Sequence, residues 1–398
     1  MKKFFGRMLK AIGALLGGLV ALVVVLLLVM WVADPAVVRN LLFGQSPTDP
    51  TGIAKSQPQE GFRGAPRDDI PTGSADAIDP AGIAAAEAYA DATESVALLI
   101  YQRGALRYEK YWPGFDRGTR TNPNSMHKTV LALLVGAAIA DGYIESPDAR
   151  ASKWLTEWQG DAGRDITVRD LLQMSSGLEI PIFGTWKSTR ILLGSNLPEA
   201  VFALSADKPH GSEFQYSNAN SQLLLILLER ATGKRYSNYL SSRLWQPLGA
   251  GDASLWMDRE GGLPRGFCCL FATARDWLRV GRLILDQGRV DGEQLVPASW
   301  IAEMLRPAST NPNFGLHLWL GSPPGRERRY NDYAVKASHS EPFAAADIAY
   351  IDGFGGQRVY VVPSLQLVIV RLGKSRVDWD DAILPNAIIR AVRPETSP

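Results

Sequence analysis

The chain has 398 residues, a hydrophobic content of 46% and a formal net charge of +1. This length and composition allow one large domain or two, each with a sizeable core. The balanced charge gives no reason to expect nucleic acid as a partner. The two cysteines, Cys268 and Cys269, are adjacent, a spacing too short for ordinary disulfide geometry. We therefore interpret them as small buried residues, with a reactive thiol as the alternative.

The N-terminus has the pattern of a membrane anchor. Basic residues lie within 1–10, and the stretch from Ala11 to Ala33 carries no charge. As a helix this stretch would span about 35 Å, enough for a bilayer core of roughly 30 Å. Trp31 stands where a signal-peptide cleavage site needs a small residue. We expect an uncleaved, single-pass anchor over 11–33 in the inner (cytoplasmic) membrane, with a cytoplasmic tail over 1–10. The chain after Asp34 then faces the periplasm; a cleaved signal peptide is the alternative.

The rest of the chain divides into a linker and one domain. Residues 34–79 are rich in Pro, Gly, Asp and Ser, which predicts a flexible linker. A helix is expected from Pro80, followed by a hairpin of strands around Arg103-Gly104. Helices dominate 125–310, including one that ends at Gly233 and one that begins with a capping box of Thr273 and Asp276. Strands return over 358–373, so distant segments should build one sheet around a helical insertion.

Ser125 and Lys128 are the strongest candidates for catalytic residues. They stand three apart at the head of an apolar run, so on a helix they lie one turn apart on the same face. Backbone N–H groups of a first turn can stabilise an oxyanion. Burial of this apolar helix would lower the pKa of a lysine, as a lysine base requires. An N-capping serine beside a snorkelling lysine is the structural alternative, and His127 should point away from this pair.

Two further motifs occur twice, and context separates the copies. A second Ser-x-x-Lys, Ser205 to Lys208, is followed by Pro209 and Gly211, which stop a helix. Of the two Tyr-Ser-Asn motifs, the one at Tyr236 falls into a core-facing stripe. Tyr216 instead lies between a loop and a helix, where its phenol can reach a site. We therefore expect Tyr216 to handle the proton of the leaving group.

Other catalytic machineries are absent from the sequence. It has no G-x-S-x-G, no H-E-x-x-H and no phosphate-binding G-x-x-x-x-G-K-[ST]. The four histidines are scattered, so we predict no metal site and no organic cofactor.

The chain resembles the class C β-lactamase-like branch of the penicillin-recognising serine hydrolases, which includes family VIII carboxylesterases and 6-aminohexanoate-dimer hydrolases. The similar pieces, in the family's order over roughly 80–395, are "SMHK", "ITVRDLLQMSSGL", "YSNANSQLLLILLERATGKRY", "LWQPLGA", "FATARDWLRVGRLIL" and "GFGGQRVYVVPSLQLVIVRLG". The resemblance implies an α+β fold of the β-lactamase/transpeptidase type. An antiparallel sheet flanked by helices would carry a mostly helical subdomain.

The resemblance also implies roles for individual residues. Ser125 would be the acyl-accepting nucleophile, Lys128 the base and Tyr216 the proton shuttle. The backbone N–H groups of Ser125 and Phe354 would form the oxyanion hole. Substrate contacts would come from Asn218, which could also contact Lys128, and from Gly353 and Gly355.

One departure from the family's pattern bears on the substrate. Where penicillin-processing members carry K-T-G or K-S-G, this chain has Ile351-Asp352-Gly353. An apolar residue and an acid in place of the cation should disfavour an anionic ligand. We therefore expect a membrane-anchored hydrolase of small-molecule esters or linear amides. The alternatives are a cell-wall peptide hydrolase or weak β-lactamase of the same fold, and a non-catalytic sensor of peptidoglycan or β-lactams.

Overall fold

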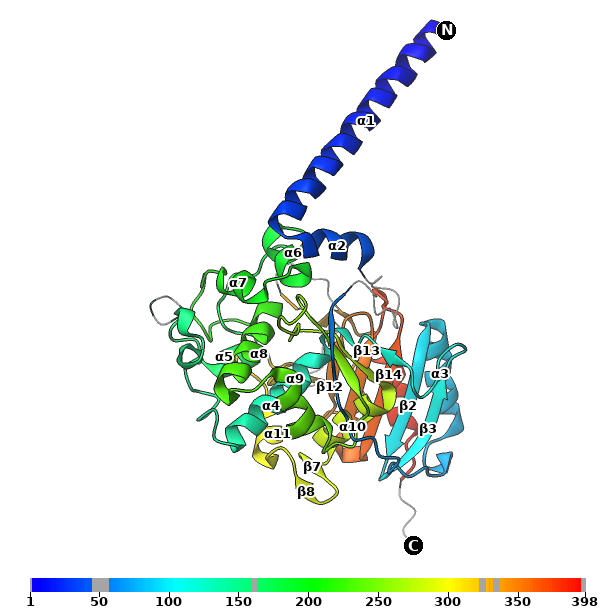
Figure 1. The fold of residues 1–398 in the computed structure, drawn as a ribbon. Coiled ribbons are helices and arrows are strands. Elements are labelled where there is room, and N and C mark those ends of the chain that lie inside the picture. The colour runs from blue at the N-terminus through cyan, green and yellow to red at the C-terminus, as the bar shows by residue number, and fades with distance from the viewer. Residues whose placement is uncertain are drawn as a thin grey trace.

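A long helix at the N-terminus stands apart from the rest of the molecule (Figure 1). The computed structural model describes residues 2–44, 57–158, 160, 163–321, 327–328, 330–331 and 337–394. Its first helix, α1 (Lys2–Ala33), contains the predicted span. The segment Phe4–Ala33 is long and apolar enough to cross a membrane, and its most apolar window is not buried against the protein.

A six-stranded antiparallel sheet forms the centre of the fold. Its order is β3-β2-β14-β13-β12-β9. The strands are β2 (Ser95–Gln102), β3 (Ala105–Tyr111), β9 (Trp319–Leu320), β12 (Ala349–Gly353), β13 (Gln357–Val362) and β14 (Leu367–Gly373). Arg103 and Gly104 form the predicted hairpin turn, both at positive φ (47° and 79°), as such a turn requires. Because β2 pairs with β14, the sheet joins distant segments, as predicted.

Helices cover both faces of this sheet. On one face, α3 (Pro80–Ala92) and α12 (Ile383–Ala391) pack against buried residues of the strands. On the other lies α10 (Ala274–Leu285), which begins with the predicted capping box. It lies close to the sheet at Gly281, where a Cβ would come within 2.6 Å of a methyl carbon of Val359.

The helical part of the chain surrounds a buried helix, α4 (His127–Ala140). Every residue of α4 from His127 to Ala138 is buried, as its all-round apolar character predicts. The helix α8 (Asn218–Thr232) packs against it and ends at Gly233, whose φ of 66° suits a glycine cap. The other helices of this part are α5 (Val168–Leu172), α6 (Trp186–Leu193), α7 (Leu197–Phe202), α9 (Tyr236–Leu240) and α11 (Ala298–Met304).

A second sheet connects two loops that are distant in the sequence. It has the order β1-β5-β6-β4, with β1 (Gln59–Phe62), β5 (Ala253–Trp256), β6 (Leu270–Thr273) and β4 (Arg120–Thr121). Since β4 leads into residues 122–128 and β6 follows residues 265–269, their antiparallel pairing places these loops together. Two short strand pairs lie outside these two sheets: β7 (Arg289–Val290) with β8 (Glu293–Gln294), and β10 (Glu327–Arg328) with β11 (Ala337–Ser338).

The prediction of a flexible linker over 34–79 is wrong for much of the part that the structure describes. Residues Pro35–Phe43 form α2, and β1 pairs with β5. The Asp34 carboxylate accepts hydrogen bonds from the backbone N and the Oγ of Ser195, at 2.8 and 2.9 Å. Asn40 Nδ2 donates to the Leu193 carbonyl at 2.7 Å. Short docked elements such as these lack the periodicity that reveals longer ones. Residues 45–56 lie outside the described part.

Candidate active site

The predicted nucleophile lies in a tight turn at the start of α4. Residues Asn124–Met126 form a 3₁₀ turn that continues directly into α4. Asn124 takes a positive φ of 51°, which asparagine tolerates better than most residues. Its backbone N donates to Asn122 Oδ1 at 3.0 Å. Lys128 Nζ lies 3.0 Å from Ser125 Oγ, so the structure brings the two predicted residues together as the i, i+3 spacing indicates.

Lys128 is buried, with three oxygen atoms around its amine. Besides Ser125 Oγ, its Nζ lies 2.9 Å from Asn218 Oδ1 and 2.8 Å from the Phe267 carbonyl oxygen. Burial lowers the pKa of Lys128 to about 7, although the Asp352 carboxylate acts in the opposite direction. The amide and carbonyl oxygens can only accept, so they occupy two N–H groups of the amine. In the neutral amine, the lone pair can then face Ser125.

Tyr216 completes this group from the segment before α8. Its ring lies 4.9 Å from Lys128 Nζ, centroid to nitrogen, and its phenol interacts with the Ser125 side chain. The Tyr216 ring stacks on Trp319, with centroids 5.9 Å apart. The Tyr216 backbone N donates to the Tyr330 carbonyl at 2.8 Å. Burial, and secondarily the Asp352 carboxylate, raises the pKa of Tyr216. The phenol is therefore protonated at neutral pH.

His127 and Tyr236 lie behind the site and form a hydrogen bond with each other. The Cys268 carbonyl lies 2.9 Å from His127 Nδ1 and can only accept, so Nδ1 carries the proton. Nε2 then accepts from the Tyr236 hydroxyl at 2.7 Å. Burial lowers the pKa of His127 to about 4, so the imidazole is neutral. Both side chains are buried and, as expected, neither faces Ser125.

The turn between β12 and β13 lies against the Ser125 segment. At Gly353, a Cβ would stand 2.1 Å from the Pro123 carbonyl oxygen, so only glycine allows this approach. Asn124 Nδ2 donates to the Phe354 carbonyl at 2.9 Å, which ties the turn to the nucleophile's loop. Gly355 has a φ of 79°, and a Cβ there would meet Ser375 at 2.4 Å. These protein contacts explain both glycines; their roles toward substrate, and the Phe354 N–H in an oxyanion hole, stay predictions.

Asp352 does not present the free negative charge that we expected near the substrate. Its carboxylate is buried and lies 2.6 Å from Arg358 Nη1 and 3.1 Å from Arg328 Nη2. The Tyr330 hydroxyl donates to it at 3.0 Å. The neighbouring Ile351 is fully buried in the core on the sheet face that α10 covers. The expected repulsion by Asp352 is therefore wrong, because paired arginines neutralise the carboxylate; the absence of a lysine at position 351 remains.

The second Ser-x-x-Lys motif is not assembled. The Ser205 hydroxyl contacts the carboxylates of Asp207 and Glu179, at 2.6 and 3.2 Å. Lys208 forms an ion pair with Glu213. Among the described residues, no group of His, Cys, Asp and Glu could hold a metal ion.

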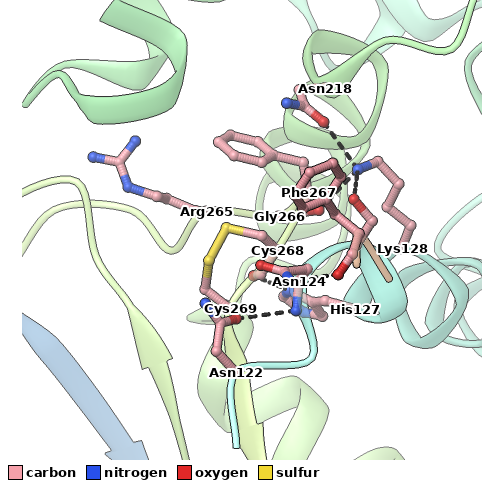
Figure 2. The surroundings of a disulfide bond; sticks show 12 residues. Asn122, Asn124, His127, Lys128, Asn218, Arg265, Gly266, Phe267, Cys268 and Cys269 are labelled. Carbon is pink, nitrogen blue, oxygen red and sulfur yellow. Dashed lines mark hydrogen bonds between the residues drawn. A yellow bond between two sulfur atoms is a disulfide. The ribbon is translucent and has the colours of Figure 1, made fainter. Parts of the chain in front are cut away.

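The two cysteines form a disulfide, contrary to our interpretation of the pair as separate small side chains. Figure 2 shows Cys268 and Cys269 joined directly beside Phe267 and the start of α4. Their Cα atoms are 3.7 Å apart, closer than in ordinary disulfides. The interpretation was wrong because it assumed the common geometry, in which adjacent cysteines do not pair. The contact of Lys128 with the Phe267 carbonyl was not predicted either, because a backbone acceptor leaves no signature in the sequence.

Curated proteins are similar to parts of this chain. The chain is 30% identical over 238 residues to the 6-aminohexanoate-dimer hydrolase of Paenarthrobacter ureafaciens, covering 55% of this chain and 60% of that protein. It is 24% identical over 165 residues to Protein flp of Staphylococcus aureus (strain NCTC 8325 / PS 47), covering 38% and 32%. The chain thus spans less than two thirds of the length of these curated relatives.

Solved structures show the same fold. A Bacillus anthracis protein provisionally described as a 6-aminohexanoate-dimer hydrolase aligns with a TM-score of 0.69 and 19% identity, over 85% of this chain and 92% of that one. A penicillin-binding protein homologue from Caulobacter crescentus aligns with a TM-score of 0.60 and 15% identity, over 79% and 98%. Residues 83–393 match the model of the Beta-lactamase family. The chain belongs to this family.

Proposed function

We propose that the protein hydrolyses esters or linear amides through an acyl-enzyme on Ser125, with Lys128 and Tyr216 as the acid–base pair. The observation that carries the proposal is the surroundings of the Lys128 amine. Two of its directions are occupied by oxygens that only accept, and the third faces Ser125 Oγ at 3.0 Å. With a pKa of about 7, a large share of this amine is neutral at physiological pH and can accept a proton.

The proposed reaction has two halves. In acylation, Lys128 takes the hydroxyl proton as Ser125 Oγ attacks the carbonyl carbon, and the backbone N–H groups of Ser125 and Phe354 bind the oxyanion. The Tyr216 phenol, which interacts with the Ser125 side chain, passes a proton to the leaving alcohol or amine and is reprotonated from Lys128. In deacylation, water gives up a proton along the same path, attacks the acyl carbon and releases the acid and Ser125.

A neutral substrate fits the residues around this group. Position 351 holds a buried isoleucine instead of a cation, and Arg358 is engaged with Asp352, Asp381 and the Gly353 carbonyl. No arginine or lysine of strands β12 and β13 is therefore left to bind a β-lactam carboxylate. The relative named for the 6-aminohexanoate dimer supports linear amides as one substrate class. A non-catalytic sensor would need no neutral lysine beside its serine, so this alternative is disfavoured.

We further propose that α1 anchors the enzyme in the inner membrane with its catalytic domain in the periplasm. The length and apolar character of Phe4–Ala33 support the span, and the basic residues within 1–10 support a cytoplasmic N-terminus.

Turnover of p-nitrophenyl butyrate tests the assignment of the nucleophile. Ser125→Ala should abolish turnover and labelling by a fluorophosphonate, because no other described serine has a buried lysine amine beside it. Ser205→Ala is the matched control from the second Ser-x-x-Lys motif and should retain nearly full activity. Equal losses in both variants would refute the assignment. Nitrocefin turned over faster than the ester by the wild type would refute the preference for neutral substrates.

A further inference from the structure

The Cys268–Cys269 disulfide belongs to the short segment that supports the predicted base (Figure 2). Three consecutive residues of this segment contact the start of α4 and the 3₁₀ turn before it. The Phe267 carbonyl accepts from Lys128 Nζ at 2.8 Å, and the Cys268 carbonyl accepts from His127 Nδ1 at 2.9 Å. The Cys269 N–H donates to the Asn124 carbonyl at 3.3 Å. A shift of this backbone would therefore reach the base and both ends of the nucleophile's turn.

The chain is firmly held on both sides of these residues. Upstream, the buried Arg265 guanidinium donates to the carbonyls of Ile191 and Gly194 at 3.0 and 2.8 Å. The Gly266 N–H donates to Gln222 Oε1 at 2.9 Å. Downstream, β6 begins at Leu270 and pairs with β4 and β5. Between these anchors, the disulfide is the covalent restraint on the backbone of residues 268 and 269.

Cys269 has a backbone conformation that a free cysteine would tend to leave. Its φ is 69°, in the left-handed region that is unfavourable for residues with a Cβ. The disulfide closes a small ring through both residues and limits rotation of their backbone. If the ring opens, Cys269 can relax toward negative φ, and the neighbouring carbonyls of Cys268 and Phe267 can turn away from α4.

We propose that the Cys268–Cys269 disulfide is a redox-dependent positioning element for Lys128, so that the enzyme is fully active only when the disulfide is closed. This inference rests on the proposed role of Lys128 as the base. A disulfide oxidoreductase or oxidised glutathione closes the ring by taking two electrons from the two cysteine thiols into its own disulfide. The cysteines release two protons, and the reduced oxidant takes up two protons to become a pair of thiols. A dithiol reductant reverses the exchange through a mixed disulfide. An oxidising compartment favours the closed form, so a domain exported to the periplasm would gain its full activity there.

Cys268 is more accessible than Cys269 to attack by an external thiol. This residue is half-buried, whereas Cys269 is buried against Phe271 and Trp256. The thiolate of the reductant would bond to Cys268 Sγ, Cys269 Sγ would leave, and a second thiol of the reductant would release Cys268.

The experiment compares oxidised wild-type enzyme with the same enzyme reduced by dithiothreitol, with the two thiols counted by maleimide labelling and mass. The chain has two cysteines, so an effect of the reductant can be traced to this pair. Reduction should lower kcat for p-nitrophenyl butyrate roughly 10- to 100-fold, with a smaller change in KM, because the base is misplaced. The acid limb of the pH–kcat profile should move down by about one pH unit, because the ammonium form loses an acceptor. Oxidised glutathione should restore both values.

Two double variants separate the ring from the backbone conformation. Cys268→Ser/Cys269→Ser should resemble the reduced enzyme and ignore reductant. Cys268→Ser/Cys269→Gly should recover part of kcat, because glycine adopts positive φ without penalty. Active enzyme with the same pH profile in both redox states would overturn this inference alone. Oxidised enzyme that neither turns over the ester nor labels at Ser125 would count against the proposed function, and this inference would fall with it.

Discussion

At the scale of single residues, the site depends on the protein oxygens that surround the Lys128 amine. A surface lysine keeps a high pKa because water solvates the ammonium form; at Lys128, protein oxygens replace water. Asn218 and the Phe267 carbonyl fix the direction of the amine, and burial lowers its pKa. Positioning and basicity thus come from the same enclosure, since the walls that exclude water also supply the acceptors.

The pH profile of the wild type should show the titration of Lys128. Its pKa in the folded enzyme is about 7, below the ordinary 10.5, and the neutral form is the base. kcat/KM for p-nitrophenyl butyrate should therefore rise about tenfold per pH unit below pH 7 and level off above it. A limb that continues to rise toward pH 10 would show a lysine with an ordinary pKa and contradict the assignment.

Replacing the neutral acceptor at position 218 by an acid should move this limb. Asn218→Asp places a carboxylate about 2.9 Å from Lys128 Nζ, which favours the ammonium form and raises its pKa by about 1–3 units. Activity at pH 7 should fall about 5- to 500-fold, as the neutral fraction of the amine falls, and recover in part near pH 9. Asn218→Ala, which removes the acceptor without adding charge, is the control and should not shift the limb upward. A limb that stays near pH 7 in Asn218→Asp would contradict our account of this contact.

At the scale of elements, local signals were reliable where a few neighbouring residues decide the conformation. The hairpin at Arg103-Gly104, the helix end at Gly233 and the capping box of Thr273 and Asp276 were predicted from such signals. Elements fixed by distant contacts were not. The short helix α2 is held by contacts with Ser195 and Leu193, and the sequence of residues 34–44 does not predict these contacts.

The capping box at the start of α10 should contribute to stability without affecting chemistry. Thr273 Oγ1 accepts from the Asp276 N–H at 3.2 Å, and the Asp276 carboxylate accepts from the Thr273 N–H at 3.0 Å. Thr273→Ala should lower the free energy of unfolding by about 1 kcal/mol, as for other N-caps. Urea denaturation measures this change, with Thr273→Ser as a control that keeps the hydroxyl and most of the stability. An unchanged unfolding midpoint in Thr273→Ala would show that the cap is dispensable.

At the scale of the whole molecule, the site forms where two sheets meet the helical part. The Ser125 and Lys128 pair was predictable because both residues lie on one helical turn. Asn218 was expected from the family's motif. The Phe267 carbonyl, the disulfide and the arginine pairing of Asp352 were not predictable, because each depends on tertiary contacts. The pairing of β4 with β6 brings residue 267 to residue 128, and sequence spacing gives no indication of it.

The attachment of α1 determines how the domain should behave at a membrane. The helix α2 begins directly after Asp34, whose carboxylate binds Ser195, so the chain passes from the expected span to the catalytic domain without a free tether. We predict that the protein stays in the membrane fraction after a carbonate wash. Under the proposed topology, protease added to spheroplasts should digest the domain, whereas the outer membrane of intact cells should protect it. A chain lacking residues 1–33 should be recovered in the soluble fraction when it is exported by another signal. A natural soluble form that begins near Asp34 or Val37 would show that α1 is a cleaved signal peptide and would contradict the anchor.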